Sequence, residues 1–145
     1  KELFSLNKLL SDVISGINLL DQNTINLPNQ NLEIYANKIE LYHVFQNLIS
    51  NAITHNDKDP IIINISVSKL PTEYVFSVSD NGPGIDEKYH TKIFEMFSQL
   101  QVNDATQSSG VGLAIVNKIV SENKGAISVE SEKNLGLKIS FSWQF

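Results

Sequence analysis

The strongest constraint on the fold of this chain is a pair of segments in which apolar and polar residues alternate. The segments are PIIINISVSKL, residues 60–70, and TEYVFSVSD, residues 72–80. Alternation with a period of two predicts strands that bury one face, and the turn near Pro71 predicts that these strands pair as a hairpin. AISVESE and GLKISFSWQF, residues 126–132 and 136–145, predict a second hairpin in the same way.

Long helices are predicted where apolar residues recur every three or four positions. This pattern covers residues 4–22, 38–56 and 110–125. A shorter helix is predicted over residues 86–97 and a short strand over residues 31–36. Hairpin-connected strands and separate helices predict an α+β fold, in which helices cover one face of a single sheet.

Composition restricts the partners and the chemistry of the chain. The formal net charge is −5, and all 11 basic residues are lysines. Such a chain lacks the concentrated basic face that grips a nucleic-acid backbone or an anionic membrane surface, so we expect neither partner. The chain contains no cysteine, which excludes disulfides, thiolate catalysis and zinc sites built from cysteine.

The length of the chain bounds its domain organisation. A chain of 145 residues fits one domain, and no linker or internal repeat divides it, so residues 1–145 are predicted to form a single domain. No apolar stretch approaches the roughly 20 residues that span a bilayer. The chain begins at Lys1 and stops on a predicted strand, which indicates a domain cut from a longer protein.

The stretch SVSDNGPGID, residues 77–86, raises the question of a binding site. Asp80 ends a strand that should run into the core, and Gly82 and Gly84 follow it. A carboxylate only accepts hydrogen bonds, so at the floor of a pocket Asp80 could select an exocyclic amine such as that of adenine. The glycines would let a flat base approach the backbone. Asn-Gly and Pro-Gly are also frequent in turns that bind nothing, so the binding site and the plain turn both stay open as interpretations.

A second polar cluster lies on the helix predicted over residues 38–56. Asn47 and Asn51 are four residues apart, and a step of four advances about 40° around a helix axis, so the two amides project side by side. Amide oxygens suit Mg²⁺, which takes few protein ligands and completes its shell with water and phosphate. On this helix alone, the polar face of an ordinary amphipathic helix is the better interpretation.

The segment SSGVGLAIV opens the third long helix. Gly110 and Gly112 could leave backbone N–H groups free at its N-terminus, where the helix dipole favours an anion such as phosphate. A flexible loop end explains the glycines equally well. The segment has neither the GK[ST] of a P-loop nor the third glycine of a dinucleotide fingerprint. The three histidines show no metal-ligand spacing, and only His55 lies near the proposed site.

The order of these motifs is more specific than any one of them. HVFQNLISNA, DNGPGI, IFEMF and GVGLAIV resemble the N, G1, F and G2 boxes of sensor histidine kinases, and the similarity covers nearly the whole chain. The pattern around KYHTKIFEMFSQLQ is especially similar to the phytochrome-type and PAS-linked kinases. The resemblance implies the catalytic, ATP-binding domain of such a kinase. Its fold would be the Bergerat fold of DNA gyrase and the MutL-type ATPases, a two-layer α/β sandwich with a mixed, mostly antiparallel sheet covered by about three helices.

The resemblance also implies roles for individual residues. Asp80 matches the acceptor for the adenine amine, Asn51 matches the Mg²⁺ ligand, and Asn47 is its polar neighbour in the catalytic centre. Phe94 and Phe97 match the F box, which packs beneath a mobile lid. The resemblance implies that this lid covers about residues 98–109. The implied nucleotide-binding set is Asn47, Asn51, His55, Asp80, Gly82, Gly84, Ile85, Gly110, Val111, Gly112 and Leu113.

The activity implied by the resemblance is phosphoryl transfer from ATP, with Mg²⁺ offsetting the charge of the phosphates. The acceptor would be a histidine on a separate dimerisation domain, a response regulator would act downstream, and the parent protein would be a homodimer with this domain in the cytoplasm. In the family an acidic residue normally follows the acceptor histidine. Val, Asn and Thr follow His43, His55 and His90 here, so the chain is not expected to phosphorylate itself.

Two alternatives to a histidine kinase stay open. A hydrolytic ATPase of the same fold would carry a water-activating Glu four residues before the metal asparagine, where this chain has Asn47. A degenerate scaffold that binds nucleotide weakly is suggested by Thr54 and Gln99, which stand where many members carry basic residues. Asn47 at that position and the F box favour the kinase over the hydrolytic ATPase, and intact Asn51, Asp80 and glycines argue against the scaffold.

Overall fold

The computed structural model describes residues 1–85, 108–132 and 134–145. Its helices and strands, in chain order, are β1 (Glu2–Ser5), α1 (Leu6–Ser15), β2 (Thr24–Asn26), β3 (Glu33–Ala36), α2 (Lys38–Thr54), β4 (Ile62–Lys69), β5 (Glu73–Asp80), α4 (Ser108–Glu122), β6 (Ile127–Glu132) and β7 (Gly136–Gln144). Among the described residues, no helix has the length and apolar character needed to traverse a bilayer.

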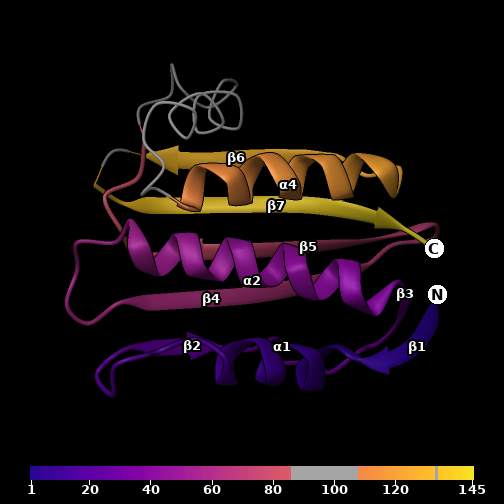
Figure 1. Cartoon of the computed structure of the whole chain (residues 1–145), viewed down its shortest axis with the longest axis horizontal. Coiled ribbons are helices and arrows are strands. Elements are labelled where there is room, and N and C mark those ends of the chain that lie inside the picture. Colours follow the sequence, from indigo (N-terminus) through magenta and orange to yellow (C-terminus); the bar gives the residue numbers. More distant parts are fainter. Residues whose placement is uncertain (86–107, 133) are drawn as a thin grey trace.

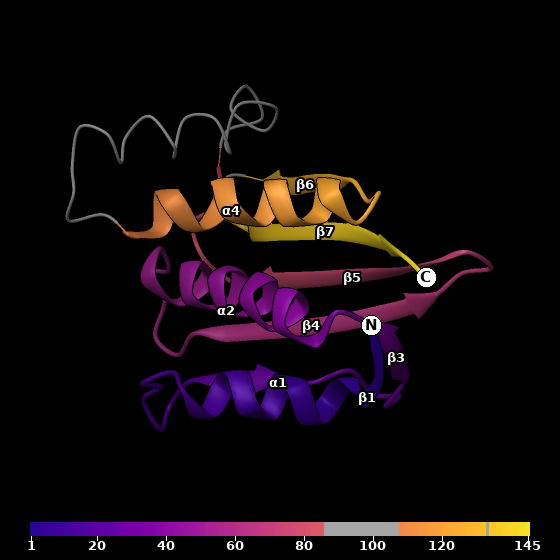
Figure 2. The same ribbon diagram turned by 45° about the vertical axis from the view of Figure 1, so that its right-hand side comes forward.

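Five of the strands form one mixed sheet in the order β2-β4-β5-β7-β6. Only β2 and β4 run parallel, and every other neighbouring pair in this sheet is antiparallel. Figures 1 and 2 show α1, α2 and α4 lying side by side on one face of the sheet. β1 and β3 form a separate two-stranded ribbon. The predicted α+β sandwich with a mostly antiparallel sheet is therefore confirmed.

Both predicted hairpins are present, and the first of them positions Asp80. β4 and β5 pair from Lys69 with Tyr74 to Ile63 with Asp80, and the Leu70 N–H closes the turn on the Glu73 carbonyl oxygen at 2.8 Å. The opposite side of β5 pairs with β7, so Asp80 ends a strand that has a neighbour on both sides. The carboxylate thus emerges from the middle of the sheet, at the end remote from the turn.

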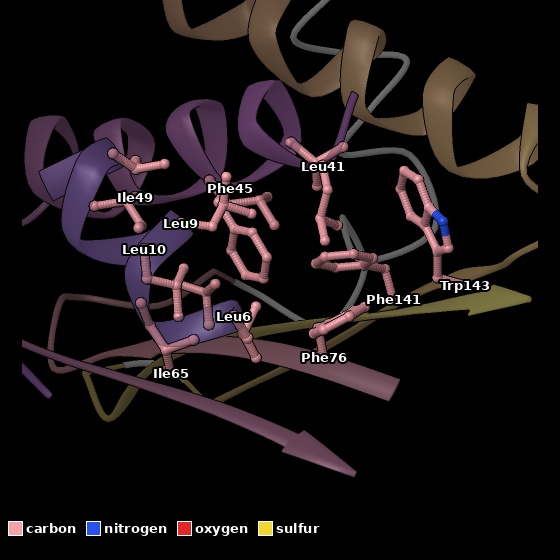
Figure 3. Packing of buried hydrophobic residues seen from close by; sticks show 14 of the residues in the cluster. Leu6, Leu9, Leu10, Leu41, Phe45, Ile49, Ile65, Phe76, Phe141 and Trp143 are labelled. Carbon is pink, nitrogen blue, oxygen red and sulfur yellow. The ribbon is translucent and has the colours of Figure 1, made fainter. Parts of the chain in front are cut away.

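The core lies between the helices and the covered face of the sheet, and aromatic residues form its centre (Figure 3). The ring of Phe45, on α2, lies 5.5 Å from the rings of both Phe76 on β5 and Phe141 on β7. Trp143 continues the same face of β7 and is fully buried. Alternation along the strands therefore sends every second residue into this layer, as the sequence predicts.

The first predicted helix is shorter than expected. Apolar spacing indicated a helix over residues 4–22, but α1 spans only Leu6–Ser15 and the chain forms β1 before it. Ser5 caps α1, because its Oγ accepts a hydrogen bond from the Lys8 N–H at 3.3 Å. Gly16 follows the last turn as the C-cap. Local caps therefore overrode an apolar pattern that continues on both sides of them.

The other two long helices agree with their predictions to within three residues. α2 begins after Asn37, whose Oδ1 accepts a hydrogen bond from the Glu40 N–H at 3.2 Å. α2 and α4 are tied together where the Asn123 amide donates to Glu40 at 3.0 Å. The predicted helix over residues 86–97 lies outside the described residues.

The predicted F box and most of the predicted lid also fall where nothing is described. Phe94 and Phe97 lie outside the described residues, as do residues 98–107 of the 98–109 lid. The last two residues of that segment belong to α4, which begins at Ser108. The helix therefore starts two residues before the glycine at which the sequence predicted it.

Candidate functional site

A cavity of about 250 Å³ opens between the helix layer and the end of the sheet where β5 stops. Its wall is mostly apolar, and its polar side chains come from three residues, Asn51, His55 and Asp80. The complete set of described residues lining it is Leu48, Asn51, Ala52, His55, Val78, Asp80, Pro83, Gly84, Ile85, Leu113, Leu137 and Ile139. A mostly apolar cavity with a few convergent polar groups is typical of small-molecule sites.

The apolar wall follows from the periodicities of the surrounding elements. Leu137 and Ile139 lie two residues apart on β7, so they face the same side of the sheet as the core residue Phe141. Leu48 and Ala52 lie four residues apart on α2 and contribute the helical side. The residues that build the core along each element therefore continue into the cavity at one end.

Asp80 is fixed at the cavity floor by backbone hydrogen bonds to one of its two oxygens. Oδ1 accepts from the Gly82 N–H at 2.8 Å and from the Leu137 N–H at 3.3 Å. No described donor bonds Oδ2. Burial raises the pKa of Asp80, while these two hydrogen bonds and the nearby His55 act in the opposite direction. The arrangement presents one oriented acceptor oxygen in apolar surroundings.

The glycines around Asp80 have specific structural reasons. A Cβ on Gly82 would lie 3.0 Å from Asp80 Oδ1, so a side chain there would crowd the carboxylate. Gly84 has a φ of +70°, in the left-handed region that favours glycine. Gly136 has a φ of +102°, and its Cβ would lie 2.1 Å from the Asp80 carbonyl oxygen. The third of these glycines was not singled out from the sequence.

Ile85 continues the loop after Asp80 and is anchored to the second hairpin. Its N–H donates to the Oγ of Ser131 at 2.8 Å, and that hydroxyl donates to the Gly136 carbonyl oxygen at 2.9 Å. The Asn134 N–H donates in turn to the Pro83 carbonyl oxygen. The β6–β7 hairpin thereby holds the rim of the cavity from residue 83 to residue 85.

Only part of the predicted polar cluster on α2 lines the cavity. Asn51 lines the cavity, and its Nδ2 is buried without a hydrogen-bond partner among the described residues. Asn47 lies one turn earlier and is not part of the lining, and its Nδ2 donates to the His43 carbonyl oxygen at 2.9 Å. His55 ends the helix as its C-cap and, like Asp80, lines the cavity.

The predicted phosphate-facing residues lie in the first turns of α4. Gly110, Val111 and Gly112 follow the first helical residue, Ser108, by two to four positions. Leu113 comes next, is 3% exposed and lines the cavity. α4 therefore reaches the same cavity as Asp80 and Asn51 through Leu113.

A metal ion at this site would depend on few protein ligands. Among the described residues no group of three or more His, Cys, Asp or Glu side chains could hold one. Magnesium fits such a site, because it commonly takes one or two protein oxygens and completes its shell with water and phosphate. The Asn51 amide supplies an oxygen of the required kind. Its buried Nδ2 has no hydrogen-bond partner among the described residues, so it could donate to an acceptor on a bound ligand.

Sequence reasoning missed the backbone and second-layer groups of the site. The Leu137 N–H that holds Asp80 comes from the far hairpin, and nothing in the local sequence marks it. Asn56 and Asn81, which each follow a predicted site residue, form a hydrogen bond to one another that also went unnoticed. The apolar wall could have been found from strand alternation, because Val78 shares its face with Phe76.

Comparison with known proteins identifies the class to which this α/β sandwich and its cavity belong. The family model described as histidine kinase-, DNA gyrase B- and HSP90-like ATPase matches residues 36–145. The chain therefore belongs to this ATPase family, in the branch formed by the catalytic domains of sensor histidine kinases.

Individual relatives support this placement. Cyanobacterial phytochrome A of a Nostoc species is 38% identical over 109 residues, which are 75% of this chain and 14% of that protein. Sensor protein RprX of Bacteroides fragilis is 32% identical and covers 95% of this chain, which spans 28% of its length. The predicted similarity to phytochrome-type kinases is thus confirmed. The chain spans well under a third of either relative.

Solved structures agree in fold. The catalytic domain of histidine kinase ThkA in a nucleotide-free form is 28% identical, with a TM-score of 0.73 over 99% of this chain and 95% of that chain. The mycobacterial sensor histidine kinase MprB shares the fold with a TM-score of 0.80 at 18% identity, over 99% of this chain and 96% of that chain.

Proposed function

We propose that this chain binds ATP together with Mg²⁺ in the described cavity and presents the γ-phosphate to a histidine on a separate dimerisation domain. One observation carries the proposal. The carboxylate of Asp80 stands in an otherwise apolar cavity with Oδ1 occupied by two backbone N–H groups, which leaves Oδ2 as an acceptor. The exocyclic amine of adenine is the donor that matches such an acceptor.

The apolar wall suits the flat faces of a purine base. Leu137 and Ile139 on the sheet, with Leu113 on α4, would contact the base while Asp80 reads its edge. Gly84 lines the cavity without a side chain and gives the base access to the backbone. Burying an apolar ring in this wall supplies affinity, and the single carboxylate supplies selectivity between bases.

The triphosphate would extend toward the end of α2 and the start of α4. Asn51 would hold Mg²⁺ through its amide oxygen, with Asn47 as a polar neighbour, and the bound metal would offset the negative charge of the phosphates. Backbone N–H groups near Gly110 and Gly112 would favour a phosphate through the helix dipole. No lysine is among the described residues that line the cavity.

The partners belong to the proposal, because the chain spans only 14% and 28% of the two relatives named above. We include a histidine-bearing dimerisation domain of the same or a sister chain, a response regulator downstream and a homodimeric parent acting in the cytoplasm. None of the three histidines of this chain is followed by an acidic residue, so the acceptor would be supplied from outside the chain.

A phosphotransfer assay tests the proposal. The chain is incubated with ATP labelled at the γ-phosphate, with and without a dimerisation domain whose histidine is followed by an acidic residue, and with Mg²⁺ or a chelator. We expect acid-labile label on the dimerisation domain only when Mg²⁺ is present, and none on the chain itself. Release of free phosphate at the same rate without any acceptor domain would instead indicate a hydrolytic ATPase.

A further inference from the structure

Two asparagine side chains outside the cavity join the segments that carry its polar groups. Asn56 directly follows His55 at the end of α2, and Asn81 directly follows Asp80 at the end of β5. The Nδ2 of Asn56 donates to the Oδ1 of Asn81 at 2.9 Å. Neither residue lines the cavity, yet each is the chain neighbour of a residue that does.

Both polar atoms of the Asn81 amide are hydrogen-bonded at the point where β4 and β5 separate. Its Oδ1 also accepts from the Ile62 N–H at 3.0 Å, and its Nδ2 donates to the Pro60 carbonyl oxygen at 3.0 Å. The Asn81 backbone N–H donates to the Ile62 carbonyl oxygen at 3.2 Å. Exchanging its oxygen and nitrogen would set donors against donors, so the network fixes the orientation of the amide.

Asn56 is held equally firmly and reaches the loop beneath Asp80. Its Oδ1 accepts from the Lys58 N–H at 2.8 Å, which leaves Nδ2 for Asn81. A Cβ on Gly82 would lie 3.3 Å from the Asn56 side chain, so the amide packs against the residue whose N–H holds Asp80 Oδ1. The end of α2 and the support of the carboxylate are therefore in contact through one side chain.

We propose that Asn56 and Asn81 are positioning residues for nucleotide recognition. The hydrogen bond between their amides fixes the spacing between the α2 side of the cavity, with Asn51 and His55, and Asp80 on the sheet side. This inference rests on the proposed function, because it concerns the same nucleotide. A preorganised site binds more tightly, since binding then does not have to order the groups that contact the ligand.

The chain offers a matched control for a test of this inference. Asn26 Nδ2 donates to Asn64 Oδ1 at 2.8 Å, which is a second amide-to-amide bond, between β2 and β4. Neither of these residues lines the cavity. The Asn56→Ser and Asn26→Ser variants each remove one such bond without changing charge. Affinities for ATP and for inosine triphosphate, which has a carbonyl oxygen in place of the exocyclic amine, are then measured by calorimetry on folded samples.

The inference predicts that Asn56→Ser weakens ATP binding about fivefold or more and reduces the preference for ATP over inosine triphosphate, because one hydrogen bond is worth about 1 kcal/mol. Asn26→Ser should keep both within about twofold, in line with an exposed pair. A merely structural role would lower the thermal midpoint of either variant without moving the preference. If Asn56→Ser does not fold, the isosteric Asn56→Asp replaces it, with Asn26→Asp as its control.

The outcomes separate this inference from the proposed function. If the unaltered chain binds ATP and Asn56→Ser matches Asn26→Ser in affinity and preference, the positioning role is wrong and the proposed function stands. If the unaltered chain does not bind ATP, the proposed function fails and the positioning role falls with it. If the preference for ATP over inosine triphosphate falls in Asn56→Ser and not in Asn26→Ser, the result supports both the proposed function and the positioning role.

Discussion

At the scale of single residues, Asp80 shows how a carboxylate is kept in apolar surroundings. Its Oδ1 accepts two backbone N–H groups, which offset part of the cost of removing a charge from water. Burial is nevertheless the largest influence and raises the pKa of Asp80 above its usual value. The folded chain therefore holds a proton on this group more tightly than the unfolded chain does.

This pKa shift predicts a dependence of stability on pH. Because the folded chain binds the Asp80 proton more tightly, stability is favoured at low pH and is lost as pH rises through the raised pKa. Asp80→Asn removes the titrating group. We expect its stability relative to the unaltered chain to increase as pH rises from about 3.9, the usual pKa of Asp, to beyond the raised value. Denaturant unfolding followed by the fluorescence of Trp143, the one tryptophan of the chain, measures this difference.

The matched control is Asp12→Asn, because Asp12 is exposed on α1 and does not line the cavity. It measures how far the loss of an exposed carboxylate by itself changes this comparison. The burial argument would be contradicted if the stability difference of Asp80→Asn changed no more with pH than that of Asp12→Asn.

Asn51 is expected to act on the metal-dependent part of binding. In Asn51→Ala the amide oxygen proposed to hold Mg²⁺ is lost while the apolar wall stays intact. The gain in ATP affinity on adding Mg²⁺ should therefore shrink, with little change in affinity measured in a chelator. Asn117→Ala, on the exposed side of α4, serves as the control variant. Asn51→Ala and Asn117→Ala are each titrated with ATP, with and without Mg²⁺. An equal loss in both conditions would mean that Asn51 is not the ligand.

At the scale of elements, the site depends on how closely the β6–β7 hairpin approaches β5. Gly136 combines a φ of +102° with a position where a Cβ would lie 2.1 Å from the Asp80 carbonyl oxygen. Gly16 has no such restriction, because a Cβ there would contact nothing closer than 3.6 Å and its φ is −85°. The two glycines therefore separate a required glycine from a replaceable one.

Backbone strain at such a position costs about 1–3 kcal/mol, and Gly136→Ala is predicted to destabilise the chain by more than this. It is also predicted to weaken ATP binding, because the Asp80 backbone must shift to make room for the new side chain. Gly16→Ala should change stability by less than about 1 kcal/mol. Thermal unfolding and ATP titration of both variants test this. Normal affinity in a destabilised Gly136→Ala chain would show that the hairpin does not position the carboxylate.

Elements with a strong period were predictable from the sequence, and those set by local caps or distant pairing were not. α2 and the two hairpins carry clear apolar periodicity, so their bounds agree closely with the structure. α1 was overextended because Ser5 and Gly16 end it inside a continuing apolar pattern. β2 was missed because it has only three residues and owes its place to parallel pairing with β4.

The candidate site was predictable to a similar degree. Asn51, Asp80 and the glycines after it belong to motifs with recognisable order, and the structure brings Asn51 and Asp80 into one cavity. The Leu137 N–H and the Asn56–Asn81 bond come from segments distant in sequence. Such groups are chosen by tertiary packing, so no local pattern reveals them.

At the scale of the whole molecule, the aromatic centre joins the helix layer to the sheet. Phe45 is fully buried and contacts Phe76 and Phe141, which lie on two neighbouring strands (Figure 3). Phe45→Ala should lower the free energy of unfolding by about 3–5 kcal/mol, because it leaves a cavity where α2 meets the sheet. Ile39→Ala on the same helix, where the side chain is 70% exposed, should have little effect.

Denaturant unfolding monitored at Trp143 measures both variants. Equal losses would mean that α2 is not held to the sheet through this contact. Because Asn51 and His55 reach the cavity from α2, we also expect Phe45→Ala to weaken ATP binding even under conditions in which the variant is folded.

The central claim is that Asp80 reads the exocyclic amine of adenine, and its most direct test compares ATP with inosine triphosphate in the unaltered chain and in Asp80→Asn. In the variant, the amide oxygen must still accept from the Gly82 and Leu137 N–H groups, so the NH₂ takes the place of Oδ2 and faces the base as a donor. The unaltered chain should prefer ATP by about tenfold or more, the value of a hydrogen bond to a charged group. Asp80→Asn should abolish or reverse that preference, whereas an unchanged preference would contradict the account.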